Sequence, residues 1–259
     1  GEKAGIIKRG VPVVSAPQRP EARTVFARRA SECGARLVET SDVWRPDKVT
    51  SCDGFYGAIA SRRPDGSEIV IAPSLPGQFQ IQNALTAAST AVVLCDQGFK
   101  VPEDAVKAGI SSARWPGRLE RLSERPAIYL DGAHNPAAAR ELKTFWEDNF
   151  AGRRIHLIYG AMRDKAVDEV AGLLFPMAED VILTRPRQLR AISAQHLDDI
   201  VGGLARRAEV VGDPAQAFER AIAQAVADDV IFVTGSLFLV GDIRRYWFKR
   251  NEQTSSSAR

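Results

Sequence analysis

The second half of the sequence predicts an α/β fold built on a parallel, doubly wound sheet. From residue 127 onward, short apolar runs of strand length alternate with longer segments of helical pattern. The runs are mostly apolar and do not alternate regularly with polar residues, as expected of strands covered on both faces. Strand and helix repeats of this kind favour a Rossmann-like domain.

The expected elements of this half follow one another closely. The strands are expected at residues 127–130, 155–159, 180–184, 209–211 and 230–234. The helices are expected at residues 136–150, 164–175, 193–204, 214–227 and 237–248. Proline opens two of these helices, at Pro136 and Pro214, and its fixed φ angle suits the first helical turn.

The first half is less regular. The elements expected there are a strand at 11–15, a helix from 20 to 33, a strand at 36–40, and helices at 81–94 and 102–111. Between them, residues 50–72 alternate and contain Asp65-Gly66, a dipeptide typical of hairpin turns.

Trp115-Pro-Gly-Arg118 interrupts both patterns and predicts a domain boundary, because linkers are rich in Pro and Gly. The expected division is therefore residues 1–113, residues 114–250 and a tail at 251–259. The tail is polar and rich in Ser, which favours disorder.

Composition excludes several classes of protein. The 259 residues carry a net charge of +3 without a concentrated basic stripe, which argues against a nucleic-acid partner. No apolar stretch approaches the roughly 20 residues that span a bilayer, so no membrane partner is expected. The three cysteines, Cys33, Cys52 and Cys95, form no CxxC pair, which argues against a disulfide framework or a zinc site and favours the reducing cytoplasm.

The strongest local candidate for a site is Asp131-Gly-Ala-His-Asn-Pro136, directly after the strand expected at 127–130. Ligands of open parallel sheets bind beyond the carboxyl ends of the strands. Asp131 could accept from ribose hydroxyls or assist a metal, and His134 could contact a phosphate or a base. Alternatively, Asp131 and Asn135 only cap the helix that Pro136 opens. The residues themselves leave both interpretations open.

Weaker candidates surround this motif. Thr234-Gly-Ser236 could form an anion-binding turn, but a tight strand-to-helix turn explains it better. Arg118, at the domain boundary, could clamp a phosphate, although an exposed linker arginine is the simpler interpretation. Asn83 lies in an apolar helix and needs a partner if it is buried. His156 is expected to line the core and His196 to be exposed.

A set of longer segments, taken in their order along the chain, is more specific than these local patterns. The segments are Glu2–Lys8, Gly10–Val14, Leu75–Asn83, Trp115–Glu120, Leu130–Pro136, Gly160–Lys165 and Thr234–Gly241. In this order the sequence resembles the folylpolyglutamate synthase and dihydrofolate synthase family, a branch of the Mur ligase superfamily. The resemblance covers the whole chain except the tail.

The resemblance implies a fold and a reaction. Residues 1–113 would be the rear part of a Mur-ligase-type central ATPase domain, and residues 114–250 the C-terminal domain. ATP would phosphorylate a folate or dihydropteroate carboxylate, and the amine of L-glutamate would displace the phosphate. The resemblance also implies Mg²⁺, and it leaves open whether dihydropteroate, tetrahydrofolate or both are substrates.

The family's site residues carry over to five positions. Lys3 corresponds to a carbamylated lysine that helps to organise the magnesium site, and His134, close to the nucleotide contacts, is expected to be catalytic. Asn83, Arg118 and Asp131 correspond to ATP contacts, with the nucleotide between the two domains. No metal ligand is expected in this chain.

The family's phosphate-binding loop and further metal ligands precede the segment at Glu2, where this sequence begins. The chain is therefore expected to be a fragment, inactive alone, of a protein that acts as a monomer. Two alternatives remain, another Mur-type amide ligase and a non-catalytic nucleotide-binding module. A Rossmann dehydrogenase is disfavoured because no GxGxxG follows a strand.

Overall fold

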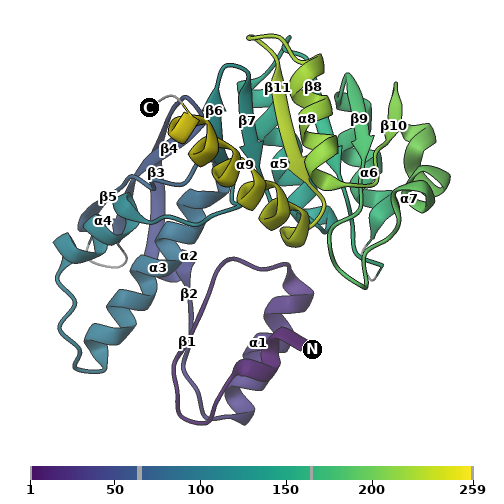
Figure 1. Cartoon of the computed structure of the whole chain (residues 1–259). Helices are drawn as coiled ribbons and strands as arrows, with labels where there is room; N and C mark the ends of the chain where they lie inside the picture. Colours follow the sequence, from purple (N-terminus) through teal and green to yellow (C-terminus); the bar gives the residue numbers. More distant parts are fainter. Residues whose placement is uncertain (1, 63–65, 164–165, 258–259) are drawn as a thin grey trace. The chain divides into compact units, whose positions relative to one another are not determined.

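The computed structural model describes residues 2–62, 66–163 and 166–257, and side chains as far as Gln253. The chain divides into two compact units, Gly1–Arg114 and Trp115–Arg259, called here the N-terminal and C-terminal units (Figure 1). Within the described ranges, no helix combines the length and the apolar character needed to cross a membrane.

The C-terminal unit is built on a six-stranded sheet in the order β10-β9-β8-β11-β7-β6. Its strands are β6 (Glu120–Glu124), β7 (Ala127–Leu130), β8 (Ile155–Tyr159), β9 (Asp180–Leu183), β10 (Ala208–Val210) and β11 (Val230–Thr234). All neighbours pair in parallel except β6, which is antiparallel to β7. The predicted α/β class with a parallel sheet is confirmed, and β6 adds an antiparallel edge that the sequence did not predict.

Helices cover both faces of this sheet. They are α5 (Pro136–Asn149), α6 (Val167–Leu174), α7 (Ala194–Val201), α8 (Pro214–Gln224) and α9 (Leu237–Ser257), with short 3₁₀ turns at Phe175–Met177 and Gly202–Leu204. On one face Ile128 and Ile231 pack with Phe218 of α8. On the other face the Phe232 ring lies 4.9 Å from that of Trp146 in α5. Every side chain of β7, β8 and β11 is consequently buried.

The direction in which successive strands are added to the sheet reverses once. The chain proceeds from β7 to β8, β9 and β10 and then returns through α8, so that β11 lies between β8 and β7 (Figure 1). Loops that follow strands on the two sides of such a reversal diverge, and the gap between them is the usual ligand site of doubly wound sheets. Here the relevant loops follow β7, β11 and β8.

The N-terminal unit contains two small sheets. The parallel pair is β1 (Val13–Ser15) with β2 (Leu37–Glu39), and the antiparallel sheet is β3 (Trp44–Cys52), β4 (Phe55–Arg62) and β5 (Glu68–Ile71). The helices are α1 (Pro20–Glu32), α2 (Thr40–Val43), α3 (Phe79–Asp96) and α4 (Glu103–Ser112), preceded by the 3₁₀ turn η1 (Glu2–Ile6). Trp44, Ile71 and Leu85 belong to the larger core of this unit.

Strand β3 begins at Trp44, ahead of the alternating segment predicted at 50–72. After Trp44 all of its residues are exposed, whereas burial alternates along β5 within the predicted segment. The turn that leads to β4 uses Asp53 and Gly54, both with positive φ angles. The hairpin predicted at Asp65-Gly66 falls partly on residues 63–65, which lie outside the described residues.

The end of the chain also differs from expectation. Helix α9 continues to Ser257 through the segment for which disorder is predicted, because no Pro or Gly follows Gly241 to end the helix. An ion pair of 3.3 Å between Arg250 and Glu219 ties the preceding turn to α8. Residues 258–259, and the helix start expected at 164, lie outside the described residues.

Candidate functional site

Three loops meet at the carboxyl edge of the C-terminal sheet. The Gly235 N–H after β11 donates to Ala133 O at 2.9 Å, and the Thr234 hydroxyl donates to the same oxygen at 3.2 Å. The Gly160 N–H after β8 donates to Thr234 O at 3.3 Å. These bonds connect the loops after β7, β11 and β8 to one another.

Gly235 is required for this close approach. Its φ angle is +98°, a conformation that residues with a Cβ rarely adopt. A Cβ at this position would lie 2.6 Å from the Tyr159 ring and 2.8 Å from Gly160 O, far inside contact distance. The glycine of Thr234-Gly-Ser236 therefore serves the packing of the loops, and Ser236 starts α9 by accepting from the Phe238 N–H at 3.1 Å.

Asp131 is the buried acid of the site, with 6% of its surface exposed. Its Oδ1 accepts from the Ala133 N–H at 2.8 Å, and its Oδ2 accepts from the Leu119 N–H at 3.0 Å. Burial raises the pKa of Asp131 to about 6, although these hydrogen bonds and the nearby charges of Arg118 and His134 act in the opposite direction. The acid is thus held by neutral donors alone.

His134 and Asn135 follow on the same loop. The His134 Nδ1 lies 2.7 Å from Gly132 O, and because a carbonyl only accepts, this nitrogen carries the proton. The Nε2 of the half-buried ring has no protein partner among the described residues. Asn135 caps α5 by accepting from the Ala138 N–H at 3.0 Å, as the alternative interpretation of the motif predicts for this residue.

Arg118 reaches this site through its backbone. It lies on the turn between Gly117 and Leu119, which both have positive φ angles of 74° and 46°. Leu119 is buried and donates to Asp131, while the Arg118 side chain is exposed. The structure therefore brings Arg118, Asp131 and His134 into one region of the C-terminal unit.

The other two predicted site residues belong to the N-terminal unit. Asn83 lies on α3 with its side chain exposed, and its Nδ2 donates to Oε1 of the buried Gln80 at 2.9 Å. Lys3 lies exposed on η1, whose neighbour Ala4 packs with Ile7 and Cys33. The two residues lie in different parts of this unit, since α3 packs in the larger core instead.

A pocket that sequence reasoning missed lies near the carboxyl ends of β8 and β9. It has a volume of about 550 Å³ and is lined by Arg163, Val167, Asp168, Ile192, Ser193, His196 and Ile200. Its polar members carry both signs of charge, and Val167 and Ile192 supply buried apolar walls. The position of Arg163 just after β8 is the one signal that pointed here.

The described residues contain no group of three or more His, Cys, Asp or Glu side chains that could hold a metal ion.

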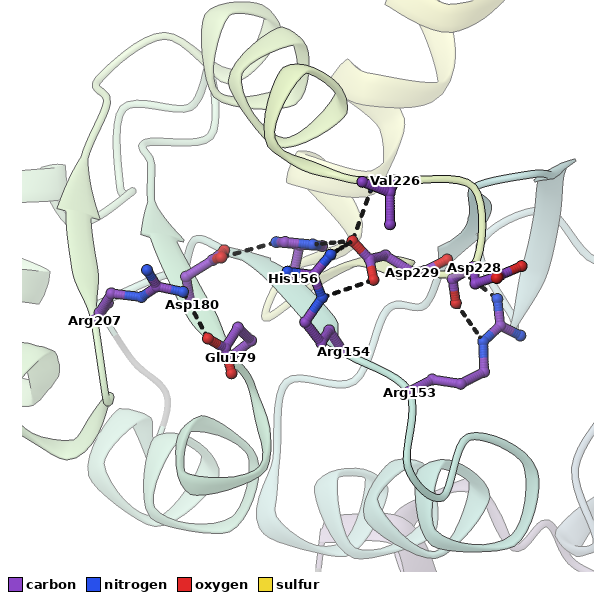
Figure 2. A network of polar contacts seen from close by, with 9 residues as sticks. All are labelled: Arg153, Arg154, His156, Glu179, Asp180, Arg207, Val226, Asp228 and Asp229. Atoms are coloured by element: carbon purple, nitrogen blue, oxygen red, sulfur yellow. Dashed lines mark hydrogen bonds and ion pairs between the residues drawn. The ribbon is translucent and has the colours of Figure 1, made fainter.

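The opposite, amino edge of the sheet holds a different polar cluster (Figure 2). His156 is 3% exposed, and its Nδ1 and Nε2 lie 2.8 Å and 3.1 Å from carboxylate oxygens of Asp180 and Asp229. Arg154 pairs with Asp229 at 2.8 Å. Burial lowers the pKa of His156, but its hydrogen bonds with the two aspartates outweigh burial and raise it. As expected, this histidine lies within the packed interior.

Comparisons with known proteins agree with these features. Residues 117–237 match the family described as Mur ligase, glutamate ligase domain. The dihydrofolate synthase/folylpolyglutamate synthase of Bacillus subtilis (strain 168) is 29% identical over 249 residues, which are 95% of this chain and 56% of that protein.

Two solved structures show the same fold. The Mycobacterium tuberculosis folylpolyglutamate synthase complexed with ADP and AMPPCP gives a TM-score of 0.82 at 25% identity, over 95% of this chain and 58% of that one. The Escherichia coli FolC protein in complex with DHPP and ADP gives 0.79 at 28% identity, over 96% of this chain and 56% of that one. The chain spans a little over half the length of these relatives.

The domain match, the relatives along nearly the whole chain and the shared fold agree with the motifs read from the sequence. The chain is similar along nearly its whole length to the folylpolyglutamate synthase and dihydrofolate synthase family of the Mur ligase superfamily.

Proposed function

We propose that this chain is part of an ATP-dependent ligase that joins L-glutamate to a folate or dihydropteroate carboxylate through an acyl phosphate. The observation that carries the proposal is the convergence of Arg118, Asp131 and His134 at the carboxyl edge of a sheet that matches a glutamate ligase domain. Because the chain spans a little over half of its relatives, the whole reaction is assigned to the whole protein.

The reaction has two balanced steps. The folate or dihydropteroate carboxylate oxygen attacks the γ-phosphorus of ATP, which releases ADP and forms the acyl phosphate. The glutamate amine then attacks the acyl carbon, forms the amide, loses a proton and expels phosphate. Both steps place negative charge on phosphoryl oxygens, so cationic and N–H groups fixed near them lower the barrier.

The proposed roles of the residues follow from what each can offer. Arg118 is exposed on a fixed backbone and can contact the nucleotide phosphates, as can the Nε2 of His134. Asp131 holds the loop that carries both residues, and Asn83 is a further proposed nucleotide contact. Bound Mg²⁺ would neutralise charge on the transferred phosphoryl group, with Lys3, carbamylated and so anionic, helping to organise its site.

The pocket beside β8 is the proposed site for the amino acid. Arg163 and His196 can offer positive charge or hydrogen-bond donors to two carboxylates, and Asp168 can accept from an ammonium group. Ser193 adds a hydroxyl group. Such a mixture suits a zwitterionic dicarboxylic acid better than an apolar ligand.

The test is an assay of ATP- and glutamate-dependent phosphate release in the natural full-length polypeptide. Dihydropteroate and tetrahydrofolate are compared as acceptors, which also separates the two branches of the family. Replacing Arg118 by Ala should lower kcat/KM for ATP about 100-fold, a loss typical of a charged contact. The matched control is Arg121→Ala, which removes an exposed arginine paired with Glu124 on β6 and should leave activity within about twofold. A wild-type protein that releases no glutamate-dependent phosphate with either acceptor would refute the proposal.

The amino-acid pocket is tested separately. Arg163→Ala should raise the KM for glutamate and leave the KM for ATP unchanged, because the pocket and Arg118 serve different substrates. Arg140→Ala, on an exposed position of α5, is the matched control. Equal effects of both variants on the glutamate KM would exclude the pocket.

A second candidate function is amide ligation to another acceptor. The match of residues 117–237 is to a domain described for Mur ligases in general, so it is compatible with an acceptor other than a folate. The same phosphate assay with a muramyl peptide as acceptor distinguishes the two. The cytoplasm is the proposed compartment, since Cys52 and Cys95 are exposed free thiols.

A further inference from the structure

The turn that carries Arg118 combines an exposed side chain with an unusually constrained backbone. Gly117 and Leu119, on either side of it, both have positive φ angles. For Leu119, whose Cβ disfavours this conformation, the surrounding structure has to supply compensation. A strained backbone beneath a solvent-exposed arginine indicates that the direction of the side chain matters.

Two bonds attach this turn to the end of β7. The Leu119 N–H donates to Asp131 Oδ2 at 3.0 Å, and the Gly132 N–H donates to Gly117 O at 2.8 Å. The Leu119 side chain is 1% exposed and anchors the same segment in the core. These contacts fix one side of the turn.

The other side of the turn is fixed by α9. The Gly117 N–H donates to Glu120 Oε2 at 2.9 Å, and the Arg244 Nε lies 2.9 Å and 3.1 Å from the two oxygens of the same carboxylate. A Cβ on Gly117 would lie 2.8 Å from Val240 Cγ1, so the turn sits directly against the helix. The Glu120 carboxylate thus connects α9 with the backbone beneath Arg118.

This pair differs from an ordinary surface ion pair. Glu120 is only 19% exposed, and its carboxylate also accepts a backbone N–H in a strained turn. The next arginine on the helix, Arg245, is 77% exposed and reaches Asp242 only at 3.8 Å, whereas Arg244 is 38% exposed. An ion pair made at such a distance by an exposed guanidinium contributes little.

We propose that Glu120 and Arg244 are positioning residues, which hold the Gly117–Leu119 turn so that Arg118 meets the nucleotide in one fixed direction. The inference rests on the proposed function, in which Arg118 contacts ATP. Without the Glu120–Arg244 pair, the turn samples other backbone conformations, and the guanidinium has to be ordered when the nucleotide binds. The loss therefore falls on nucleotide affinity, because an unordered contact weakens the ground state and the transition state alike.

The experiment is a double-mutant cycle in the natural full-length polypeptide, with KM for ATP and kcat as readouts. Arg244→Gln and Glu120→Gln should each raise the KM for ATP about tenfold with kcat within about twofold. In the Arg118→Ala background, Arg244→Gln should have no further effect, since the contact it positions is already gone. Arg245→Gln is the matched control on the same helix and should match the wild type.

Two outcomes would overturn the proposal. An equal rise in KM from Arg244→Gln with and without Arg118 would show that Arg244 acts on the nucleotide by another route. A fall in thermal stability with unchanged KM would show a purely structural pair. Arg244→Lys keeps the charge but not the two-point geometry, so it should restore the KM only in part.

Failure of the proposed function gives a different result. The wild type would then release no glutamate-dependent phosphate, and the same cycle is repeated with the dissociation constant of ADP, measured by calorimetry. If Arg118→Ala weakens ADP binding and Arg244→Gln weakens it only when Arg118 is present, the positioning role holds without the ligase. If ADP does not bind to the wild type, the positioning role is refuted as well.

Discussion

A buried aspartate lies at each edge of the C-terminal sheet, and the pKa values of the two are shifted in opposite directions. At the amino edge, Asp229 accepts from the Val226 N–H, His156 and Arg154, and these hydrogen bonds outweigh burial and lower its pKa (Figure 2). At the carboxyl edge, Asp131 has only backbone N–H partners, and burial raises its pKa to about 6. At the amino edge charged side chains pair with the aspartate, whereas at the carboxyl edge the buried acid has backbone partners and the side chain of Arg118 stays exposed to a ligand. This difference separates a stabilising cluster from a candidate site on one sheet.

The largest expected effect comes from breaking the charged cluster at the amino edge. Asp229→Ala leaves His156 and Arg154 without a shared acceptor, and loss of one partner of a buried ionic cluster costs about 3–5 kcal/mol. We expect the free energy of unfolding, measured by urea denaturation, to fall by about that amount. Nucleotide affinity of the remaining folded protein should not change. The control is Asp228→Ala, because Arg153 contacts only the backbone oxygen of that exposed residue.

The pH dependence of stability tests the raised pKa of Asp131. Its folded pKa of about 6 exceeds the ordinary aspartate pKa of 3.8, so the folded state binds more protons than the unfolded state between these values. Stability should therefore fall as the pH rises from about 4 to 6, by up to about 3 kcal/mol from this group. Asp229, with its lowered pKa, contributes in the opposite sense and loses its contribution as the pH falls.

Asp131→Asn isolates this contribution. The variant cannot ionise, so the difference in unfolding free energy between wild type and variant should change with pH across that window. Asp199→Asn, at an exposed position of α7, should show no such change. A constant difference between wild type and Asp131→Asn from pH 4 to 7 would contradict the assignment of the raised pKa.

A smaller effect is expected from His156. Its pKa is raised despite burial by hydrogen bonds to Asp180 and Asp229, so the protonated ring stabilises the fold below the unfolded pKa of about 6.5. This contribution should disappear as the pH rises through the folded pKa. The stability difference between wild type and His156→Gln should therefore shrink with rising pH, with the exposed His196→Gln as control. A difference that grows with pH would indicate a neutral ring.

The sequence predicted the centre of the fold better than its edges. The strands at 127–130, 155–159 and 230–234 were predicted with the limits that the structure shows, because strands buried on both faces are mostly apolar along their length. Strand β6 and the start of β3 were missed since both are rich in polar residues and have few buried side chains, which resembles loop sequence. The fold class is confirmed, while the residues assigned to the nucleotide and metal remain predictions.

The candidate site shows the same limit. The loop of Asp131 and His134 could be found because its residue types follow a predicted strand directly. The partners of that loop could not, since Leu119 contributes only its backbone N–H. Arg244 is separated from Glu120 by 124 residues, and no local pattern links them. Contacts of this kind depend on the completed sheet.

The place of β11 in the sheet has a consequence for how the protein folds. This strand comes last in the chain, yet it lies between β7 and β8, which pair with it and not with each other. During synthesis from the N-terminus, the facing edges of β7 and β8 remain without their hydrogen-bond partner until residues 230–234 emerge. Long-range pairing of this sort slows folding and leaves apolar strand edges exposed to other chains in the meantime. The C-terminal unit should therefore form cooperatively and late, after its final strand has left the ribosome.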